Sequence, residues 1–310
     1  MPLSLIESSQ HIVLIAHKNP DADSLGSASA FYSYILRLQK KVTLFCSSPH
    51  INPHLGFLPW FDKLSHRFPE DADLLICFDC GSFKRLGIDT QLPLISFDHH
   101  VSNDFFATKN VVNTAAISTT EVVYDFFVTN DIKINGKIAQ SLYAGLVDDS
   151  RCFSAPECNE KTFELARALI AHGADHAECV SWLYHRKSLS SLRIRGALLK
   201  QMKLLNNGKL ALFEVSQLLL EETGAKISEC KEVLEEALSM RCVQASLLVA
   251  ELPSGEIKIS LRTDGEVNAS EILSHYGGGG HAKRAGAQIK HENHREFVQN
   301  IMSEISKELV

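Results

Sequence analysis

Short apolar runs that alternate with helical patterns are the strongest constraint on the fold of this chain. The run His11–Ala16 is rich in branched residues, which is typical of a strand buried on both faces. Apolar residues at helical spacing follow over Ser24–Leu38, and a carboxylate or serine just before them can cap the helix N-terminus. A strand that leads directly into a helix predicts an α/β fold.

The same alternation continues through the first half of the chain. It predicts strands over Val42–Cys46, Asp73–Asp79 and Leu92–Phe97, and helices over Thr119–Thr129 and Asn135–Val147. We expect an open, mostly parallel, doubly wound sheet with helices on both faces. Such sheets bind ligands at the carboxyl ends of their strands, so the residues after each strand are the first candidates for chemistry.

The second half returns to this alternation after a mainly helical stretch that begins at Glu160. The pattern predicts strands over Leu210–Val215, Ala245–Leu252 and Ile257–Leu261, and helices around Ile227–Ser239 and Ala269–His275. These segments indicate a second, smaller α/β domain.

The length of 310 residues is about twice that of a usual domain, which favours two domains. We place a first domain at residues 1–185, a helical interdomain linker at residues 186–204 and a second domain at residues 205–310. The helical pattern of the middle stretch, and its excess of basic over acidic residues, set these boundaries.

Composition excludes several classes of protein. Hydrophobic residues make up 45% and charged residues 22%, as in ordinary globular proteins. The net charge of -6 disfavours a protein that coats long duplex nucleic acid. The chain starts without a basic leader, and no apolar run approaches the roughly 18 residues of a membrane span, so we expect a cytoplasmic protein. Eight cysteines are too few for a disulfide scaffold and are expected to be packing thiols.

Acidic and histidine residues follow three predicted strands and one predicted helix. In chain order they are His17, Asp21, Asp23, Asp79, Asp98, His99, His100, Asp148 and Asp149. A single aspartate after a strand is usually a helix cap. Four such ends should meet at one edge of the sheet, and together they indicate a shared site.

The clustering of carboxylates argues for bound metal ions. Carboxylates so close together repel one another, and their pKa values rise unless cations are present. Aspartates mixed with neutral imidazoles suit Mn²⁺, Co²⁺ or Mg²⁺, and the absence of thiolate spacing disfavours structural zinc. Two ions fit better than one, because a shared aspartate could bridge a pair about 3.5–4 Å apart, as in phosphoester hydrolysis.

Two glycine segments are candidates for anion binding. Leu25-Gly26-Ser27 opens the first predicted helix, where free backbone amides could meet an anion and Gly26 would permit close approach. The run Gly277–Gly280 could form an anion nest, and His281, Lys283 and Arg284 add donors beside it. Neither segment matches a nucleotide P-loop or a dinucleotide motif.

These residues together resemble the DHH phosphoesterase family, which is named for the triplet found here as Asp98-His99-His100. The segment from His17 to Ser27 is similar to the first motif of the family, Asp79 to its second and Gly145–Asp149 to its fourth. The segment Gly277–Gly286 looks like the motif of the DHHA1 domain that follows in one subfamily.

The resemblance implies a set of metal ligands. His17, Asp21 and Asp79 would bind one Mn²⁺, while Asp23, Asp79, His99 and Asp149 would bind the other, with Mg²⁺ or Co²⁺ as alternatives. A hydroxide held between the ions would attack phosphorus in line. His100 would contact or protonate the scissile phosphate, and Asp98 would orient the neighbouring histidines.

The resemblance also implies the substrate contacts and the substrate class. Contacts would come from Arg262, Gly278, Gly279, Gly280 and His281. Arg284, which stands in a region where the family usually has alanine, would add a cation that could shift preference toward a terminal phosphate. The combination of the two domains is similar to the nano-RNase group, which implies hydrolysis of short single-stranded oligonucleotides, of linear dinucleotides such as pApA or pGpG, or of 3′-phosphoadenosine 5′-phosphate (pAp). We expect no long duplex partner, no membrane and a homodimer.

One departure and two alternatives stay open. The fourth motif commonly reads Thr-Asp-Thr-Gly in the family, whereas this chain has Asp148-Asp149-Ser150-Arg151, so a role of Asp148 in metal binding is undecided. An inorganic pyrophosphatase of the same superfamily shares the first four motifs but lacks the glycine-rich histidine loop. A non-catalytic nucleotide sensor with a vestigial metal site would bind without turnover.

Overall fold

The computed structural model describes residues 2–290 and 294–309. The chain divides into two compact units, Met1–Arg186 and Lys187–Val310. Helix α7 (Leu189–Gln201) covers most of the segment 186–204, for which a separate linker was predicted. Its side chains Ile194 and Leu198 are fully buried in a core of the second unit. This helix is therefore part of the second unit, because its apolar face packs there.

The first unit contains a six-stranded parallel sheet, which confirms the predicted α/β class. Its strands are β1 (His11–Ala16), β2 (Lys41–Phe45), β3 (Leu64–Ser65), β4 (Leu74–Phe78), β5 (Leu94–Asp98) and β6 (Lys109–Val112). The strand order is β3-β2-β1-β4-β5-β6, and each neighbouring pair is parallel. The chain therefore runs outward from β1 in one direction and from β4 in the other. The carboxyl ends of all six strands meet at one edge.

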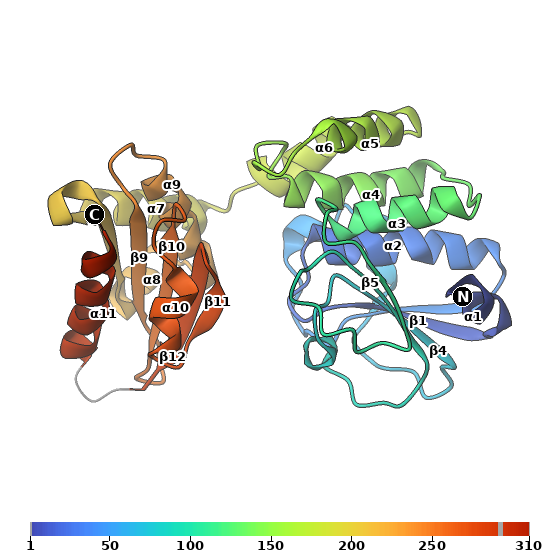
Figure 1. Cartoon of the computed structure of the whole chain (residues 1–310), viewed down its shortest axis with the longest axis horizontal. Helices are drawn as coiled ribbons and strands as arrows, with labels where there is room; N and C mark the ends of the chain where they lie inside the picture. The colour runs from blue at the N-terminus through green and yellow to red at the C-terminus, as the bar shows by residue number, and fades with distance from the viewer. Residues whose placement is uncertain (1, 291–293, 310) are drawn as a thin grey trace. The chain divides into compact units, whose positions relative to one another are not determined.

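The helices of the first unit gather on one face of this sheet (Figure 1). They are α1 (Pro2–Ser8), α2 (Ala22–Arg37), α3 (Thr119–Thr129), α4 (Gly136–Asp149), α5 (Glu160–Ala171) and α6 (His176–Val180), followed by one π-helical turn, η4 (Ser181–His185). Phe31 on α2 lies at the centre of the core between sheet and helices, where its ring centroid is 4.9 Å from that of Phe97 on β5.

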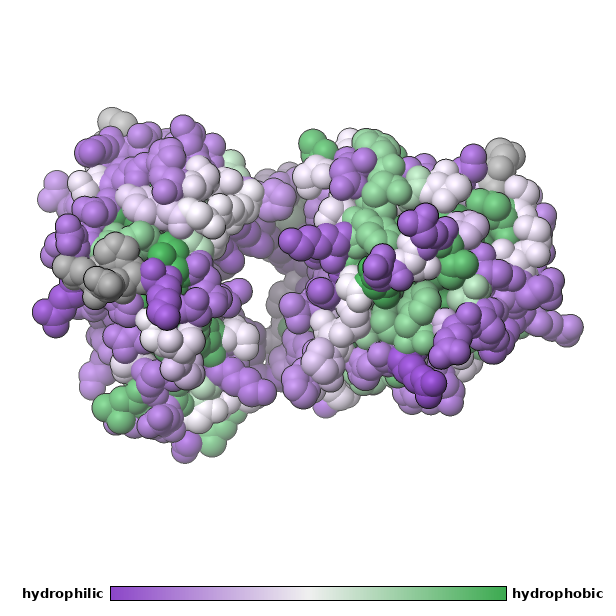
Figure 2. All heavy atoms as spheres, turned by 90° about the horizontal axis from the view of Figure 1, so that it is seen from below, coloured by the Kyte–Doolittle hydropathy of each residue, from purple (hydrophilic) through white to green (hydrophobic). Residues whose placement is uncertain are grey.

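The prediction of helices on both faces is wrong for the described residues. Loops and the 3₁₀ turn η3 (Phe83–Leu86) cover the other face, with Phe68, Phe83 and Phe106 partly buried against Cys77 and its neighbours. Figure 2 views the molecule from this side and shows a band of apolar surface on the first unit. The connection from β4 to β5 contains glycines and a proline that interrupt a regular helix. Two more 3₁₀ turns, η1 (Pro53–Leu55) and η2 (Phe61–Lys63), join β2 to β3.

The second unit is a mixed sheet with helices on both faces. Its strands are β7 (Lys203–Leu205), β8 (Leu210–Val215), β9 (Ala245–Glu251), β10 (Ile257–Thr263), β11 (Gly279–His281) and β12 (Arg284–Ile289), in the order β11-β12-β10-β9-β8-β7. Strands β8 and β9 are parallel, and the other neighbouring pairs are antiparallel. The remaining helical elements are η5 (Asn206–Gly208), α8 (Gln217–Thr223), η6 (Ile227–Lys231), α9 (Glu232–Leu238), α10 (Ala269–Ser274) and α11 (His294–Glu308).

Two separate cores hold the second unit together. Helices α10 and α11 pack on one face of the sheet, where Ile257, Ile259 and Leu261 of β10 are buried. Helices α7 and α9 pack on the other face against β8 and β9. The alternate residues of β10, from Lys258 onward, point away from the first of these cores.

Gly26 has a different role from the one that the sequence suggested. It was expected to let an anion approach the start of the first helix, but it is buried between α2 and α4. A Cβ atom at this position would collide with the backbone carbonyl oxygen of Ser141 on α4. The amides at the start of α2 are instead bound by protein carboxylates: Asp21 Oδ1 accepts from Ser24 N at 2.9 Å, and Asp148 Oδ2 accepts from Ala22 N at 3.0 Å.

We therefore predict that Gly26→Ala destabilises the protein by about 1–3 kcal/mol, because the backbone of α4 has to move to accept the methyl group. Urea unfolding followed by circular dichroism measures the change. The control is Gly196→Ala on α7, where a Cβ atom has no heavy atom within 4 Å and the better helix former should stabilise by up to about 1 kcal/mol. Equal unfolding midpoints for the two variants would contradict the tight helix contact.

Candidate metal centre

The site lies at the carboxyl edge of the parallel sheet, between β1 and β4, where the strand order reverses. A crevice at such a reversal is where open α/β sheets bind ligands. His17 follows β1 and Asp79 follows β4, and His17 Nε2 lies 3.2 Å from Asp79 Oδ2. The pairing of β1 with β4 thus brings together two side chains that are 62 positions apart in the sequence.

His17, Asp21 and Asp79 form the first group of potential ligands. Each contributes one ligand atom, and these atoms all lie within 4.8 Å of one another. His17 Nδ1 lies 2.8 Å from the carbonyl oxygen of Lys18, which can only accept, so this nitrogen carries the proton. Nε2 is then the nitrogen that faces the carboxylates of Asp21 and Asp79, where it can hold a proton or, in its place, a metal ion. This is the arrangement in which histidine ligates metals.

Asp23, His99 and Asp149 form the second group, again with ligand atoms within 4.8 Å of one another. His99 Nδ1 lies 3.2 Å from the carbonyl oxygen of Ala116, so Nε2 is the nitrogen directed toward the acidic side chains. That Nε2 is 3.3 Å from Asp149 Oδ2 and 3.5 Å from Asp79 Oδ1. His99 of the second group therefore lies next to Asp79 of the first group.

Asp79 presents one oxygen to each group. Oδ2 faces His17, while Oδ1 faces His99 and accepts a 3.0 Å hydrogen bond from the hydroxyl of Thr119. Its backbone has φ 57°, a left-handed conformation that is unusual for a residue other than glycine. Such strain is found where a functional position requires it. Asp79 therefore lies between the two groups, with one oxygen toward each.

The N-terminus of α3 holds Asp23 in place. Asp23 is fully buried, and its two oxygens accept hydrogen bonds from the amides of Thr119 and Thr120 at 2.7 and 2.8 Å. These amides have no partner within their own helix, and the helix dipole favours a negative charge there. Thr119 and Thr120 escaped the sequence analysis, because nothing in their spacing shows that they reach a residue almost a hundred positions earlier.

The electrostatics of the acidic cluster favour the binding of cations. Burial and the neighbouring carboxylates raise the pKa values of Asp23 and Asp149, and the same causes raise the pKa of Asp148 to about 6. Burial lowers the pKa of His17, but its hydrogen bonds to Asp21 and Asp79 outweigh burial and raise this pKa to about 10. Divalent cations would offset the same negative charge more fully than protons do. Carboxylate oxygens and imidazole nitrogens are the donors that Mn²⁺ and Mg²⁺ accept, so the residues fit such ions.

Asp148 differs from Asp149 in what it contacts. It belongs to none of the three groups of potential ligands among the described residues, the third of which is Asp79, His99 and His100, and its Oδ2 accepts the Ala22 amide at the start of α2. Asp149, in contrast, reaches His99. The hydroxyl of Tyr184 donates to the Val147 carbonyl oxygen at 3.1 Å and fixes the end of α4 that carries both aspartates.

The DHH triplet is organised around Asp98, which is fully buried. Asp98 Oδ1 accepts from His100 Nδ1 at 2.7 Å and from the His99 amide at 2.8 Å, while Oδ2 accepts from Asn103 Nδ2 at 2.6 Å. Burial raises the pKa of Asp98, but the hydrogen bonds from His100 and Asn103 outweigh burial and lower it. Asn103 is a functional candidate that the sequence analysis missed, because a single loop asparagine carries no recognisable spacing.

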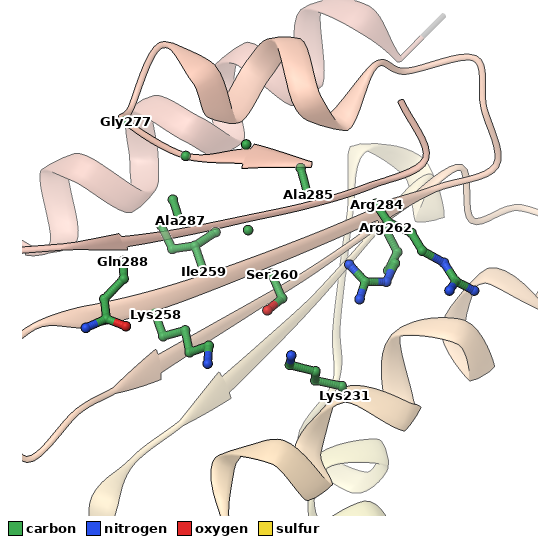
Figure 3. Close-up of a pocket in the computed structure, with 13 residues that line it drawn as sticks. Lys231, Lys258, Ile259, Ser260, Arg262, Gly277, Arg284, Ala285, Ala287 and Gln288 are labelled. Carbon is green, nitrogen blue, oxygen red and sulfur yellow. The ribbon is translucent and has the colours of Figure 1, made fainter. Parts of the chain in front are cut away.

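The predicted substrate contacts lie in the second unit, and the structure brings together some of them. A pocket of about 560 Å³ is lined by Arg262, Arg284, Gly278 and Gly279, among others (Figure 3). Gly280 and His281 are not among its lining residues. They lie in the exposed strand β11, where His281 pairs with Arg284.

The four glycines of the predicted anion nest are therefore not all explained by ligand binding. Gly280 has to be glycine because a Cβ atom there would collide with the carbonyl oxygen of Arg284 on the adjoining strand. A Cβ atom at Gly279 would meet no heavy atom within 4 Å, so neither packing nor a positive φ explains this glycine. The open space in front of Gly279 is compatible with the close approach of a ligand.

Two family descriptions match the chain. The "DHH family, N-terminal domain" matches residues 11–146, and the "DHHA1 domain" matches residues 208–307. The chain therefore contains a DHH domain and a DHHA1 domain. The first match covers every residue of the two ligand groups except Asp149, and the second covers the pocket of the second unit.

Named relatives of this DHH–DHHA1 chain extend over most of its length. The "Bifunctional oligoribonuclease and PAP phosphatase NrnA" of Bacillus subtilis is 28% identical over 286 residues, which is 90% of this chain and 89% of the relative. The protein of the same name from Thermus thermophilus is 26% identical over 304 residues, or 96% of this chain and 90% of the relative.

A solved structure shares the fold of the whole chain. The crystal structure of an exopolyphosphatase-related protein from Bacteroides fragilis matches with a TM-score of 0.90. It is 22% identical and covers 98% of this chain and 94% of that protein. Among the described residues of this chain, no helix is both long enough and apolar enough to cross a membrane.

The ligand groups predict a stabilisation by metal. Mn²⁺ should raise the melting temperature of the EDTA-treated protein, because an ion that binds the folded state alone stabilises it, by about 2.7 kcal/mol at a hundred times its Kd. Asp79→Asn should lose most of this increase, since Asp79 belongs to the first group and its Oδ1 lies 3.5 Å from His99 Nε2 of the second. Asp89→Asn, which changes an exposed aspartate outside the groups, should keep it. A full increase in Asp79→Asn, measured by differential scanning calorimetry, would contradict the shared site.

Asn103 gives a second prediction. Asn103→Ala should destabilise the protein by about 1–3 kcal/mol, because a buried carboxylate oxygen of Asp98 loses its partner. Chemical unfolding measures the change, and the neighbouring exposed Ser102→Ala is the control. If the two variants unfold at the same denaturant concentration, Asn103 does not support the triplet.

Proposed function

We propose that this protein is a metal-dependent phosphoesterase that degrades short single-stranded oligonucleotides, including linear dinucleotides, and dephosphorylates pAp. The observation that carries the proposal is the pair of aspartate–histidine groups on either side of Asp79 at one sheet edge. The names of the Bacillus and Thermus relatives support the same substrates.

Two divalent cations, Mn²⁺ in our proposal, would supply Lewis acidity to the phosphoryl oxygens and activate water. His17, Asp21 and Asp79 would hold one, and Asp23, His99 and Asp149 would hold the other together with Asp79. Asp148 would hold the start of α2 in place, because its side chain accepts a hydrogen bond from the first amide of that helix. The α3 amides on Asp23 and the Thr119 hydroxyl on Asp79 keep these carboxylates in position while substrate binds.

His100 is the candidate for proton transfer. Its hydrogen bond to Asp98 raises its pKa, with Asp79 adding to the effect against the opposing influence of burial. Because Nδ1 is bound to Asp98, Nε2 is the atom available to donate to a phosphate oxygen or to the leaving group. Asp98 would then orient the ring and stabilise its protonated form, as a buried carboxylate does for a catalytic histidine.

The second unit would hold the nucleotide. Arg262 and Arg284 line its pocket beside Gly278 and Gly279, and planar guanidinium groups suit phosphate oxygens. Gly280 and His281 would contribute from the exposed strand β11, where the side chain of His281 is accessible. The predicted homodimer, the absence of a duplex partner and the cytoplasmic location stay predictions.

A panel of substrates tests the proposal. With Mn²⁺, the purified protein should release mononucleotide from dinucleotides to 5-mers and phosphate from pAp, with kcat/KM for a 24-mer lower by about tenfold or more. Asp79→Asn should lower kcat by at least about 100-fold, because the loss even of an outer partner of a metal ligand costs 10- to 100-fold. Asp89→Asn is the matched control.

Two outcomes would contradict the proposed function. Turnover of inorganic pyrophosphate without turnover of any nucleotide would indicate the pyrophosphatase that the shared motifs also allow. Nucleotide binding without hydrolysis in Mn²⁺, Mg²⁺ and Co²⁺ would indicate a sensor.

A further inference from the structure

Lys231 and Lys258 form a cationic end of the second unit's pocket, separate from its glycine-rich end. Figure 3 shows both ammonium groups directed into the same space as the hydroxyl of Ser260 and the guanidinium of Arg262. Lys258 and Arg262 come from β10, while Lys231 is the last residue of η6. None of the described residues that line this pocket is acidic.

The register of the sheet explains why these groups converge. Successive side chains of a strand point to opposite faces, so Lys258, Ser260 and Arg262 share one face. Their partners on β12 are Gln288, Gly286 and Arg284 in that order, which places further polar side chains at both ends of the row. Gly286 opposite Ser260 leaves the middle of the row open.

The charges in the pocket are unevenly balanced. Glu235 Oε1 lies 3.0 Å from Arg284 Nη2 and 3.5 Å from Arg262 Nε, so one carboxylate forms ion pairs with both arginines. Lys231 and Lys258 take part in no ion pair within residues 2–290 and 294–309. Burial lowers the pKa of Lys231, and repulsion from Lys258 and Arg262 lowers it further.

Cations held together without a counter-charge destabilise the folded chain, and an anion in the pocket would reverse this effect. The pocket volume of about 560 Å³ is in the range of sites for small organic ligands, so it can hold more than an inorganic ion. The hydroxyl of Ser260 and the side-chain amide of Gln288 add hydrogen-bonding groups to the same face.

We infer that Lys231 and Lys258 bind a terminal phosphate of the substrate, distinct from the phosphate that is hydrolysed. The inference rests on the proposed function and narrows its substrate class. The preferred substrates would be nucleotides with two phosphate groups, such as a 5′-phosphorylated dinucleotide or a nucleoside bisphosphate. A dinucleoside monophosphate, which has only the scissile phosphate, would lose the contact with the lysines.

Kinetics test this selectivity. The ratio of kcat/KM for pApA to that for ApA should exceed 1 in the native protein. The double variant Lys231→Gln, Lys258→Gln should lower this ratio by about tenfold or more, because hydrogen bonds to charged groups are among the strongest in proteins. Lys231→Arg with Lys258→Arg should restore most of the ratio. Lys307→Gln, which removes an exposed lysine of α11 outside the pocket, is the matched control. An unchanged ratio in the double glutamine variant would overturn the inference.

Binding without metal separates this inference from the proposed function. AMP, adenosine and inorganic phosphate would be titrated into EDTA-treated full-length protein by calorimetry, where the acidic sheet edge repels phosphate. AMP should bind more tightly than either of the other two, and the double glutamine variant should weaken the binding of AMP by about tenfold or more and that of inorganic phosphate as well, while adenosine, which has no phosphate, should be unaffected. If AMP binds the native protein and the double glutamine variant equally well, the lysine site is contradicted even if pApA is hydrolysed. If AMP binds through the lysines but pApA is not hydrolysed, the proposed function fails and the lysine site stands.

Discussion

The mutual repulsion of carboxylates at the carboxyl edge of a parallel sheet is the constraint on which the rest of this structure depends. Asp21, Asp23, Asp79 and Asp149 are held in contact distance of one another or of the same imidazoles. Such a cluster raises the pKa values of its buried members unless positive charge enters it. The fold therefore brings together groups that are stable only with cations or protons between them.

The architecture around the cluster opposes this repulsion. The first unit reverses its strand order between β1 and β4, so that His17 and Asp79 meet. The N-terminus of α3 supplies two amides to Asp23, and the close crossing of α2 and α4 at Gly26 fixes the helices that carry Asp23 and Asp149. The same physical logic recurs with the opposite sign in the second unit, where lysines and arginines converge on a pocket. One unit thus gathers acidic side chains, and the other gathers basic ones.

Much of this arrangement could be predicted from the sequence. The bounds of β1, α3 and β8 agree with the predicted ranges, because long apolar runs and caps are local signals. The meeting of His17 and His99 at Asp79 was predicted because parallel strands share a carboxyl edge, which is a rule of topology rather than of local sequence.

What escaped prediction depends on contacts between distant segments. The role of Gly26 as a packing position and those of Thr119 and Asn103 as hydrogen-bond donors require the tertiary structure. Strand β11 was missed because glycines are poor strand formers, and its pairing with β12 overrides that preference. The lysine pocket forms only from the register of β10 together with the position at which η6 ends, so it cannot be predicted from any single segment.

The most direct test of the shared site is anomalous diffraction at the manganese absorption edge from crystals grown with Mn²⁺. Two peaks about 3.5–4 Å apart are expected, one contacted by His17 and Asp21, the other by Asp23, His99 and Asp149, with Asp79 touching both. A single peak, or peaks that Asp79 does not reach, would contradict the assignment of this sheet edge as a two-ion centre.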